Sequence, residues 1–290
     1  MGIPSGLRWF HGGGATEGGL CGSQPIFNLG LKVIQALGQL SARRLRRMMG
    51  ALFIYWECIM KNQLVVVIGG LSGIGRAVAE QAAAEGARVI AAGRRARPAD
   101  WPSQIEAVQL DVTDDAAVQR FFADVGAFDH LVVTAGPVIP SSRLADLVPE
   151  QAMAAFNVKV FGQLRAVKYA ARYMKAGGSV TLTSGLLSRK VMPGGVVKST
   201  MNAAVEVMGK TLAKELAPLR VNVVSPGMVE TGMWGPMSDA ERGAMAQRAG
   251  AGIPVGRVGQ GSDLAQAYLM LMQNGFMTGA VVDVDGGGLL

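Results

Sequence analysis

A glycine-rich run near residue 70 has the residue types and spacing of a phosphate-binding turn. It reads Gly69-Gly70-Leu71-Ser72-Gly73-Ile74-Gly75 and follows a short apolar segment, residues 63–68. Glycines at 69, 73 and 75 permit a tight turn and a close approach of the backbone to a pyrophosphate. A following helix offers its amides and dipole to the phosphate charge. The run therefore predicts a dinucleotide-binding turn.

Two arginines after the next apolar segment bear on the kind of dinucleotide. That segment ends Ala91-Ala92-Gly93-Arg94-Arg95. A free 2′-hydroxyl favours an acid at this point, whereas a 2′-phosphate favours cations. Gly93 stands where the acid would be, and Arg94 and Arg95 follow it. The sequence therefore favours NADP, with NAD as the alternative.

The elements that position these residues alternate along the chain. Short apolar segments predict strands at residues 63–68, 88–92, 107–110, 130–134, 179–183, 220–224 and 280–284. Helical patterns cover residues 74–86, 114–125, 149–175, 199–216 and 262–274, the last capped by Ser262 or Asp263. The alternation predicts an α/β fold: a single Rossmann-like, doubly wound parallel sheet of about seven strands with helices on both faces.

Two further segments follow predicted strands, at the strand ends where open α/β sheets bind ligands. They are Asp111-Val112 and Thr134-Ala135-Gly136. His130 lies at the amino end of its strand, away from that edge. We therefore expect His130 to be buried for structural reasons and not to be catalytic.

Taken in order, these motifs resemble the short-chain dehydrogenase/reductase family over about residues 62–290. Residues 68–75 look like that family's Thr-Gly-x-x-x-Gly-Ile-Gly, with Ile68 in place of the Thr. Residues 220–227 are close to its Arg-Val-Asn-x-Val-x-Pro-Gly. The resemblance implies a contact of Asp111 and Val112 with adenine. The other cofactor contacts that it implies are Thr134, Ala135, Gly136, Pro226, Gly227, Val229 and Thr231.

The sequence departs from the family at its catalytic positions. The family uses Asn, Ser, Tyr and Lys, with the tyrosine as general acid/base for the reacting oxygen. Asn157 matches the Asn, but Lys198 stands at the Tyr position and Asn202 at the Lys position. The Ser position falls on Gly185, next to Ser184. By this resemblance the chain is a divergent member that lacks the Tyr-x-x-x-Lys motif.

Three interpretations follow from this departure. In the first, which we favour, the protein is an NADP(H)-dependent oxidoreductase that reduces the carbonyl of a small apolar substrate. The candidate catalytic residues are then Lys198 as proton donor, Ser184 to polarise the carbonyl, and Asn157. In the second, the protein binds NADP(H) without catalysis, as a sensor or partner subunit. The third is non-redox chemistry, for which the sequence supplies no acid/base pair.

Methionines and a tryptophan indicate the substrate side. Residues 228–252 contain Met228, Met233, Trp234, Met237 and Met245. Such side chains form adaptable apolar pockets, which suits a carbonyl or alcohol substrate of apolar character. Packing against neighbouring helices is an equal alternative.

Charge is unevenly distributed along the 290 residues, whose formal net charge is +7. Residues 1–60 hold six basic and two acidic side chains, which leaves the remaining chain at +3. A nucleic-acid partner needs a basic face with groove-reading elements, and only the cluster Arg43–Arg47 is a candidate. We therefore expect no nucleic-acid partner. The two cysteines and two histidines predict no metal site.

The first 59 residues are predicted to be an N-terminal extension, poorly ordered or with a targeting or accessory role. Residues 60–290 form the predicted dinucleotide-binding and catalytic domain. The apolar run 48–60 is shorter than the about 20 residues that a spanning helix needs, so no transmembrane segment is expected. We expect a cytoplasmic location, with organellar targeting as the alternative. The family resemblance implies a homodimer or homotetramer.

Overall fold

The computed structural model describes residues 60–231, 234–235 and 237–290, so the expectations for residues 1–59 lie outside the described part. Within that part, one parallel sheet has the strand order β3-β2-β1-β4-β5-β6-β7. The strands are β1 (Leu64–Ile68), β2 (Arg88–Gly93), β3 (Glu106–Gln109), β4 (Phe128–Val133), β5 (Met174–Thr183), β6 (Arg220–Pro226) and β7 (Val281–Val284).

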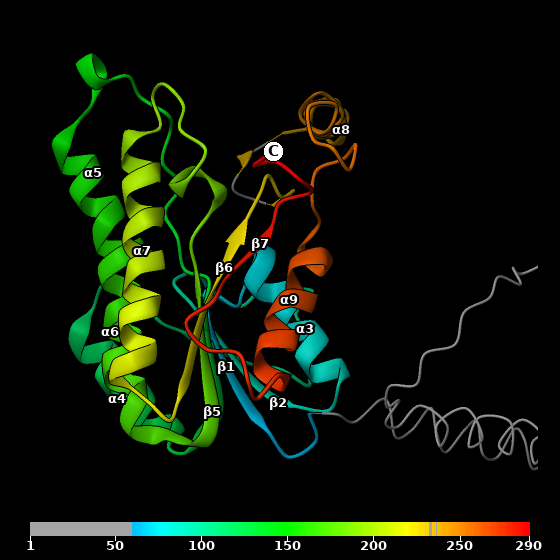
Figure 1. Cartoon of the computed structure of the whole chain (residues 1–290). Helices are drawn as coiled ribbons and strands as arrows, with labels where there is room; N and C mark the ends of the chain where they lie inside the picture. Colours follow the sequence, from blue (N-terminus) through cyan, green and yellow to red (C-terminus); the bar gives the residue numbers. More distant parts are fainter. Residues whose placement is uncertain (1–59, 232–233, 236) are drawn as a thin grey trace, which may run out of the picture. The chain divides into compact units, whose positions relative to one another are not determined.

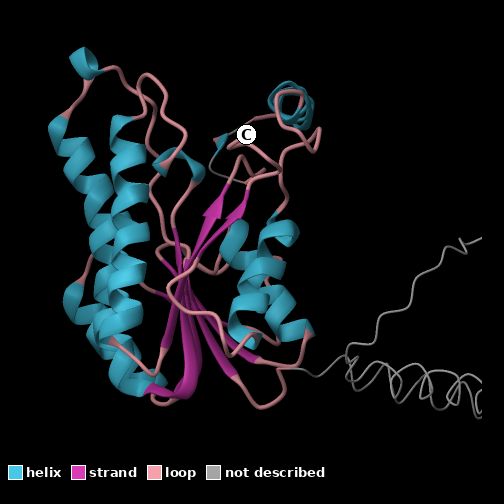
Figure 2. Ribbon diagram, in the orientation of Figure 1, coloured by secondary structure: helices cyan, strands magenta, loops and turns pink. Residues whose placement is uncertain are grey.

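Helices cover both faces of the sheet, as Figures 1 and 2 show. One face carries α4 (Asp115–Val125), α5 (Pro149–Phe156), α6 (Gly162–Ala170) and α7 (Val196–Glu215). The other carries α3 (Gly73–Ala84) and α9 (Gly261–Gln273), while α8 (Asp239–Gly250) lies beyond the carboxyl ends of β6 and β7. Short helical turns are η1 (Leu144–Asp146), η3 (Ala171–Tyr173) and η4 (Leu186–Ser188), and η2 (Asn157–Phe161) is a π turn. The predicted doubly wound fold is confirmed.

Two buried clusters hold the layers together, one on each face of the sheet. Because successive strand residues point to opposite faces, Val66 packs with Phe122 of α4 and Val205 of α7. Its neighbour Val67 packs with Leu264 of α9 in the other cluster. All five residues of β1 are buried, which explains why its sequence is a continuous apolar run.

The predicted helix over residues 149–175 is interrupted. It consists of α5 and α6 joined by the π turn η2, and β5 already begins at Met174. Gly177 has a φ of 81°, and a Cβ on Gly178 would lie 2.4 Å from the Asp129 carbonyl oxygen. These glycines accommodate the register shift between β4 and β5, so the strand starts five residues before the predicted 179.

The helix starts near the C-terminus also differ from the prediction. Gln260 caps α9, in place of the predicted Ser262 or Asp263, and its backbone N–H donates to the Asp263 carboxylate. Helix α8 was not predicted. Its start is a capping box in which the Glu241 backbone N–H donates to Ser238 Oγ and the Ser238 N–H donates back to Glu241.

His130 is buried at the amino end of the sheet, as predicted. Its ring nitrogens lie 2.9 Å from Ser179 Oγ and 3.2 Å from Gln63 Oε1. Burial lowers the His130 pKa from 6.5 to about 4. The group therefore contributes stability above pH 6.5 that is lost as the pH falls toward 4.

We expect His130→Gln to reduce this acid sensitivity. Between pH 7 and pH 4 the free energy of unfolding should fall by about 3 kcal/mol less in the variant than in the wild type. Urea unfolding at several pH values measures the difference. Parallel pH curves for the two proteins would show that His130 does not titrate in this way.

Candidate active site

The glycine-rich run forms a tight turn between β1 and α3. Gly69 has a φ of 86°, a backbone conformation that favours glycine. A Cβ on Gly75 would lie 2.4 Å from both the Gly69 carbonyl oxygen and Thr134 Oγ1. The turn therefore has no room for a side chain at these points, and α3 begins at the strand edge. A close-packed glycine cradle before a helix N-terminus fits a pyrophosphate.

The other residues of the run differ in exposure. Ser72 is the N-cap of α3, is exposed, and makes no capping bond through its side chain. Gly73 is also exposed, with a φ of 54°. Leu71 is buried and Ile74 half-buried, so their side chains belong to the core beneath the turn. Backbone groups, not these apolar side chains, are what the turn offers to a ligand.

The segment after β4 lies directly against this turn. The Thr134 backbone N–H donates to the Ile68 carbonyl oxygen at 2.8 Å. A Cβ on Gly69 would lie 2.6 Å from the Ala135 nitrogen. Gly136, which comes next, is exposed. Residues 134–136 and the glycine turn thus share one edge of the sheet, as the sequence predicts.

The segments that follow β2 and β3 lie at the same carboxyl edge of the sheet, beside the glycine turn. Arg94 and Arg95 are exposed, and the Arg94 carbonyl accepts from Gln109 Nε2. The Thr113 amide and hydroxyl, with a smaller effect from Arg94, hold the pKa of Asp111 below its usual range. Val112 is buried in the core. Arg94 and the Asp111 carboxylate therefore lie close enough to interact.

The segment after β6 returns over the glycine turn. A Cβ on Gly227, which follows Pro226, would lie 2.6 Å from the Asp285 Cα, so glycine is required there. Val229 is buried and forms an isolated bridge with Gly259. The Thr231 methyl group lies 3.4 Å from the position of a Cβ on Gly73. Thr231 is thus placed beside the predicted phosphate site.

The three predicted catalytic side chains bond to three different protein groups in this structure. Lys198 Nζ donates to Ser141 Oγ at 3.1 Å, beside the loop that follows β4. Ser184 is buried and its Oγ donates to Glu206 at 3.1 Å. Asn157 Oδ1 lies 3.5 Å from Nη2 of Arg165 on α6. Each side chain therefore has its own protein partner.

The carboxyl end of β5 is held by a buried clamp. Gln163 of α6 donates to the Thr183 carbonyl and accepts from the Thr183 N–H, both at 3.0 Å. The Thr183 hydroxyl donates to the Val133 carbonyl at 2.6 Å and lies 2.7 Å from the Tyr268 hydroxyl. These bonds fix the strand end, and with it the start of the segment that carries Ser184.

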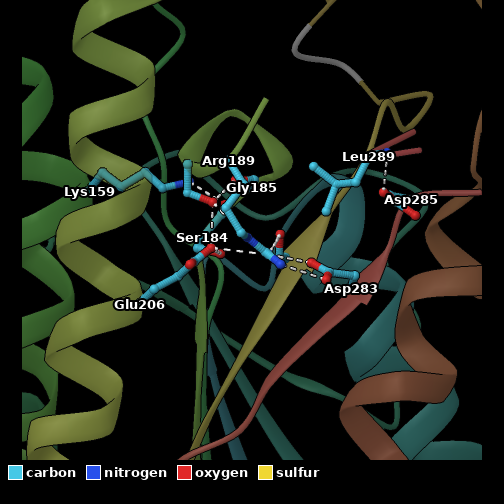
Figure 3. A network of polar contacts seen from close by, with 10 residues as sticks. Lys159, Ser184, Gly185, Arg189, Glu206, Asp283, Asp285 and Leu289 are labelled. Atoms are coloured by element: carbon cyan, nitrogen blue, oxygen red, sulfur yellow. Dashed lines mark hydrogen bonds and ion pairs between the residues drawn. The ribbon is translucent and has the colours of Figure 1, made fainter. Parts of the chain in front are cut away.

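Beyond this clamp lies a polar network of which the sequence pointed to Ser184 alone (Figure 3). Glu206 of α7 accepts from Ser184, Ser188 and Arg189. Arg189 also forms a salt bridge with Asp283 of β7. The network joins α7, the turn η4 and β7, so the turn after β5 is tied down at both sides. Ser184, Ser188 and Arg189 are close in the sequence, but Glu206 and Asp283 are distant from them, and no local motif identifies these partners.

A second unpredicted residue is Lys159, whose ammonium points at the same strand end in Figure 3. Its Nζ donates to the Ser184 carbonyl at 2.8 Å. Asn202 packs on the next residue, with its Nδ2 2.9 Å from the position of a Cβ on Gly185. A lysine between two valines, Val158 and Val160, is the sequence signal that could have identified this position.

The part of the chain that the structure describes contains no group of three or more His, Cys, Asp or Glu residues suited to a metal ion. Across residues 60–231, 234–235 and 237–290, every helix is too short or too polar to span a bilayer.

The fold and the glycine turn are those of the Rossmann-like dinucleotide-binding class. The family model described as Enoyl-(Acyl carrier protein) reductase matches residues 69–288. A short-chain dehydrogenase/reductase of Stachybotrys chlorohalonatus is 34% identical over 252 residues, which cover 80% of this chain and 98% of that protein. A 3-oxoacyl-[acyl-carrier-protein] reductase of Thermotoga maritima is 30% identical over 246 residues, covering 79% and 98%.

A solved structure is also similar to this chain. The crystal structure of a small-chain dehydrogenase in complex with NADPH is 45% identical, with a TM-score of 0.70, and the match covers 78% of this chain and 98% of that one. The chain therefore belongs to the short-chain dehydrogenase/reductase family. Its named relatives are oxidoreductases.

Proposed function

We propose that this protein is an NADP(H)-dependent oxidoreductase that reduces the carbonyl group of a small apolar substrate. The observation that carries the proposal is the glycine cradle at Gly69 and Gly75. At the end of β2, Gly93 stands where NAD-binding proteins carry an acid, and the exposed Arg94 follows it directly. The 45% identical neighbour with NADPH supports the choice of cofactor. When bound, NADPH supplies the hydride.

The residues that would hold the cofactor lie along one edge of the sheet. Backbone amides at the N-terminus of α3 would face the pyrophosphate, and Arg94, with Arg95 beside it, would face the 2′-phosphate. Residues 134–136 and 227–231 border the same edge. Asp111 is the proposed contact of the adenine.

Lys198 is the proposed proton donor to the oxygen that becomes the alcohol. It is partly exposed near the start of α7, and its ammonium reaches the loop after β4. A protonated amine suits reduction, because the oxygen gains negative charge as the carbonyl is reduced. Ser184 polarises the carbonyl once its single donor hydrogen turns away from Glu206. Asn157, the first residue of the π turn η2, is the third residue that we propose for the catalytic site.

The second candidate is an NADP(H)-binding protein without catalysis. The observation in its favour is that Lys198, Ser184 and Asn157 are each bonded to a different protein group. Our assignment of Lys198 and Asn202 to the Tyr and Lys positions of the family's motif points the same way. Both candidates predict NADPH binding, so binding alone does not separate them.

A paired measurement separates the two. NADPH binding is measured by fluorescence and by the rise in Tm that it produces, and NADPH oxidation is followed with aldehydes, ketones and quinones. Tight binding with turnover of at least one carbonyl class supports the reductase. Tight binding with no turnover across the panel favours the binding protein, and no binding contradicts both.

Arg94 is expected to select NADPH over NADH. A hydrogen bond to a charged group contributes roughly 1.5–3 kcal/mol, so Arg94→Ala should weaken NADPH binding by about 10- to 100-fold. NADH binding should not change. Titration with both dinucleotides measures this, with the exposed Arg97→Ala as the matched control. An equal loss for both dinucleotides would exclude recognition of the 2′-phosphate by Arg94.

Exposed apolar side chains on α5–α7 support the proposed homodimer or homotetramer. They include Met153, Phe161, Leu164 and Val207. Apolar clusters of this kind on a folded domain commonly mark protein interfaces. Analytical ultracentrifugation gives the oligomeric state.

A further inference from the structure

Lys159 is a buried amine at the proposed site. It belongs to the π turn η2 between α5 and α6, and its side chain runs toward the carboxyl end of β5 (Figure 3). The side chain as a whole is only half-buried, but its ammonium lies deep in the protein. Its Nζ donates to the Ser184 carbonyl at 2.8 Å.

The ammonium is poorly compensated within the protein. In the described part of the chain, no carboxylate forms an ion pair with Lys159, and the Ser184 carbonyl is the one acceptor found for its three donors. Burial lowers the pKa of this amine to about 8. A buried charge without a carboxylate destabilises the fold, and such groups cluster at functional sites.

The Ser184–Gly185 peptide, to which Lys159 donates, is held in place on both sides. Thr183, just before it, is clamped by Gln163, and the Asn202 amide packs against Gly185 just after it. Lys159 thus binds the Ser184 carbonyl, which lies between the clamped Thr183 and the packed Gly185. Its positive charge stands at the end of a central strand, flanked by β4 and β6.

We propose that Lys159 is a positioning residue of this site, which fixes the Ser184–Gly185 peptide and supplies the buried positive charge that favours bound NADPH and a negatively charged reacting oxygen. The part that concerns the reacting oxygen rests on the proposed reductase function. The part that concerns NADPH binding stands without turnover.

Other charges on the elements around Lys159 have partners of their own. Glu206 bonds to Ser184, Ser188 and Arg189, and Arg165 of α6 pairs with Asp115. Lys198 on α7 donates to Ser141, Lys190 after η4 donates to the Gly288 carbonyl, and Glu150 on α5 is exposed. Burial is the cause of the Lys159 shift, with no contribution from these groups.

The test compares Lys159→Met, which removes the charge at similar length, with Lys159→Arg, which keeps it at all accessible pH values. As the pH rises from 7 to 10, NADPH affinity of the wild type should fall by about fivefold or more, a usual size for coupling between two sites. Lys159→Met should bind weakly with no such fall, and Lys159→Arg should bind well throughout. Lys168→Met, an exposed lysine over the Tyr169 ring, is the control and should behave as the wild type.

Two further readouts separate positioning from a merely structural role. Without NADPH, the Tm of Lys159→Met at pH 7 should equal or exceed that of the wild type, because a buried charge is removed. With a reducible substrate, its kcat should fall about 10-fold with little change in KM, as expected when a charge acts on the transition state. The pH profile of kcat should lose its fall near pH 8.

Distinct results bear on the two proposals. A wild type that reduces no carbonyl overturns the proposed reductase, whatever Lys159 does. An NADPH affinity whose pH dependence is the same in the wild type and Lys159→Met overturns the Lys159 proposal. A Lys159→Met protein whose Tm and NADPH affinity fall together at every pH, without recovery in Lys159→Arg, also overturns it.

Discussion

Gly75→Ala is expected to weaken NADPH binding by about 100-fold, equivalent to roughly 3 kcal/mol. The added methyl would lie 2.4 Å from the Gly69 carbonyl oxygen and 2.4 Å from Thr134 Oγ1, two points on different strand ends. The Gly69 oxygen belongs to the backbone and cannot rotate away as a side chain can, so the turn itself must move. Overpacking of this kind costs about 1–3 kcal/mol, and here it displaces the amides that face the pyrophosphate.

The control for this substitution is Gly243→Ala. Gly243 also lies in a helix, and a Cβ added there meets nothing within 4 Å. It should leave NADPH binding unchanged, and it should not lower the Tm because alanine favours a helix. NADPH titration and thermal unfolding of both variants give the comparison. Normal NADPH affinity in Gly75→Ala would show that the turn is not the phosphate site.

Local spacing predicts the glycine turn and the order of the elements. Gly69 and Gly75 are six residues apart, between an apolar run and a helical pattern, and the structure puts them in contact with Thr134 as a doubly wound sheet requires. His130 is predictable for the same reason, since its place at the amino end of a strand implies burial away from the ligand edge. These inferences depend on sequence neighbours alone.

The polar arrangement at the end of β5 depends on long-range contacts and was not predictable. Arg189 and Asp283 are separated by 94 residues, and their pairing emerges only when η4 and β7 are brought together. The proposed role of Ser184 is to polarise a substrate carbonyl. In the structure its hydroxyl donates to Glu206, which lies on α7 and is 22 residues away in the sequence. Periodicity assigns residues to faces of a helix, and it does not choose among partners on that face.

The charge of the chain illustrates the same distinction. A net charge of +7 invites a search for an anionic macromolecule, but the charges that bear on the proposed function are individual ones. Arg94 is exposed beside a predicted phosphate position, and Lys159 is buried beside a strand end. Exposure leaves Arg94 accessible to a ligand, whereas burial lowers the pKa of Lys159.

Lys198→Met is expected to lower kcat for carbonyl reduction by roughly 100-fold or more, the usual contribution of a general acid. KM should change little, because the proton is transferred in the transition state and not on binding. The reason lies in the position of Lys198 near the start of α7, where its ammonium reaches Ser141 in the loop that follows β4. NADPH affinity should also be preserved, because the proposed phosphate contacts lie on other elements.

The matched control is Lys210→Met, which removes an exposed lysine from the same helix. Steady-state rates with the best substrate of the carbonyl panel, at saturating NADPH, compare the two variants with the wild type. A kcat for Lys198→Met equal to that of Lys210→Met would reduce Lys198 to a solvated lysine near a helix start. The proton would then come from another group, and because Lys159 is tested by its own variants, the two lysines can be assigned separately.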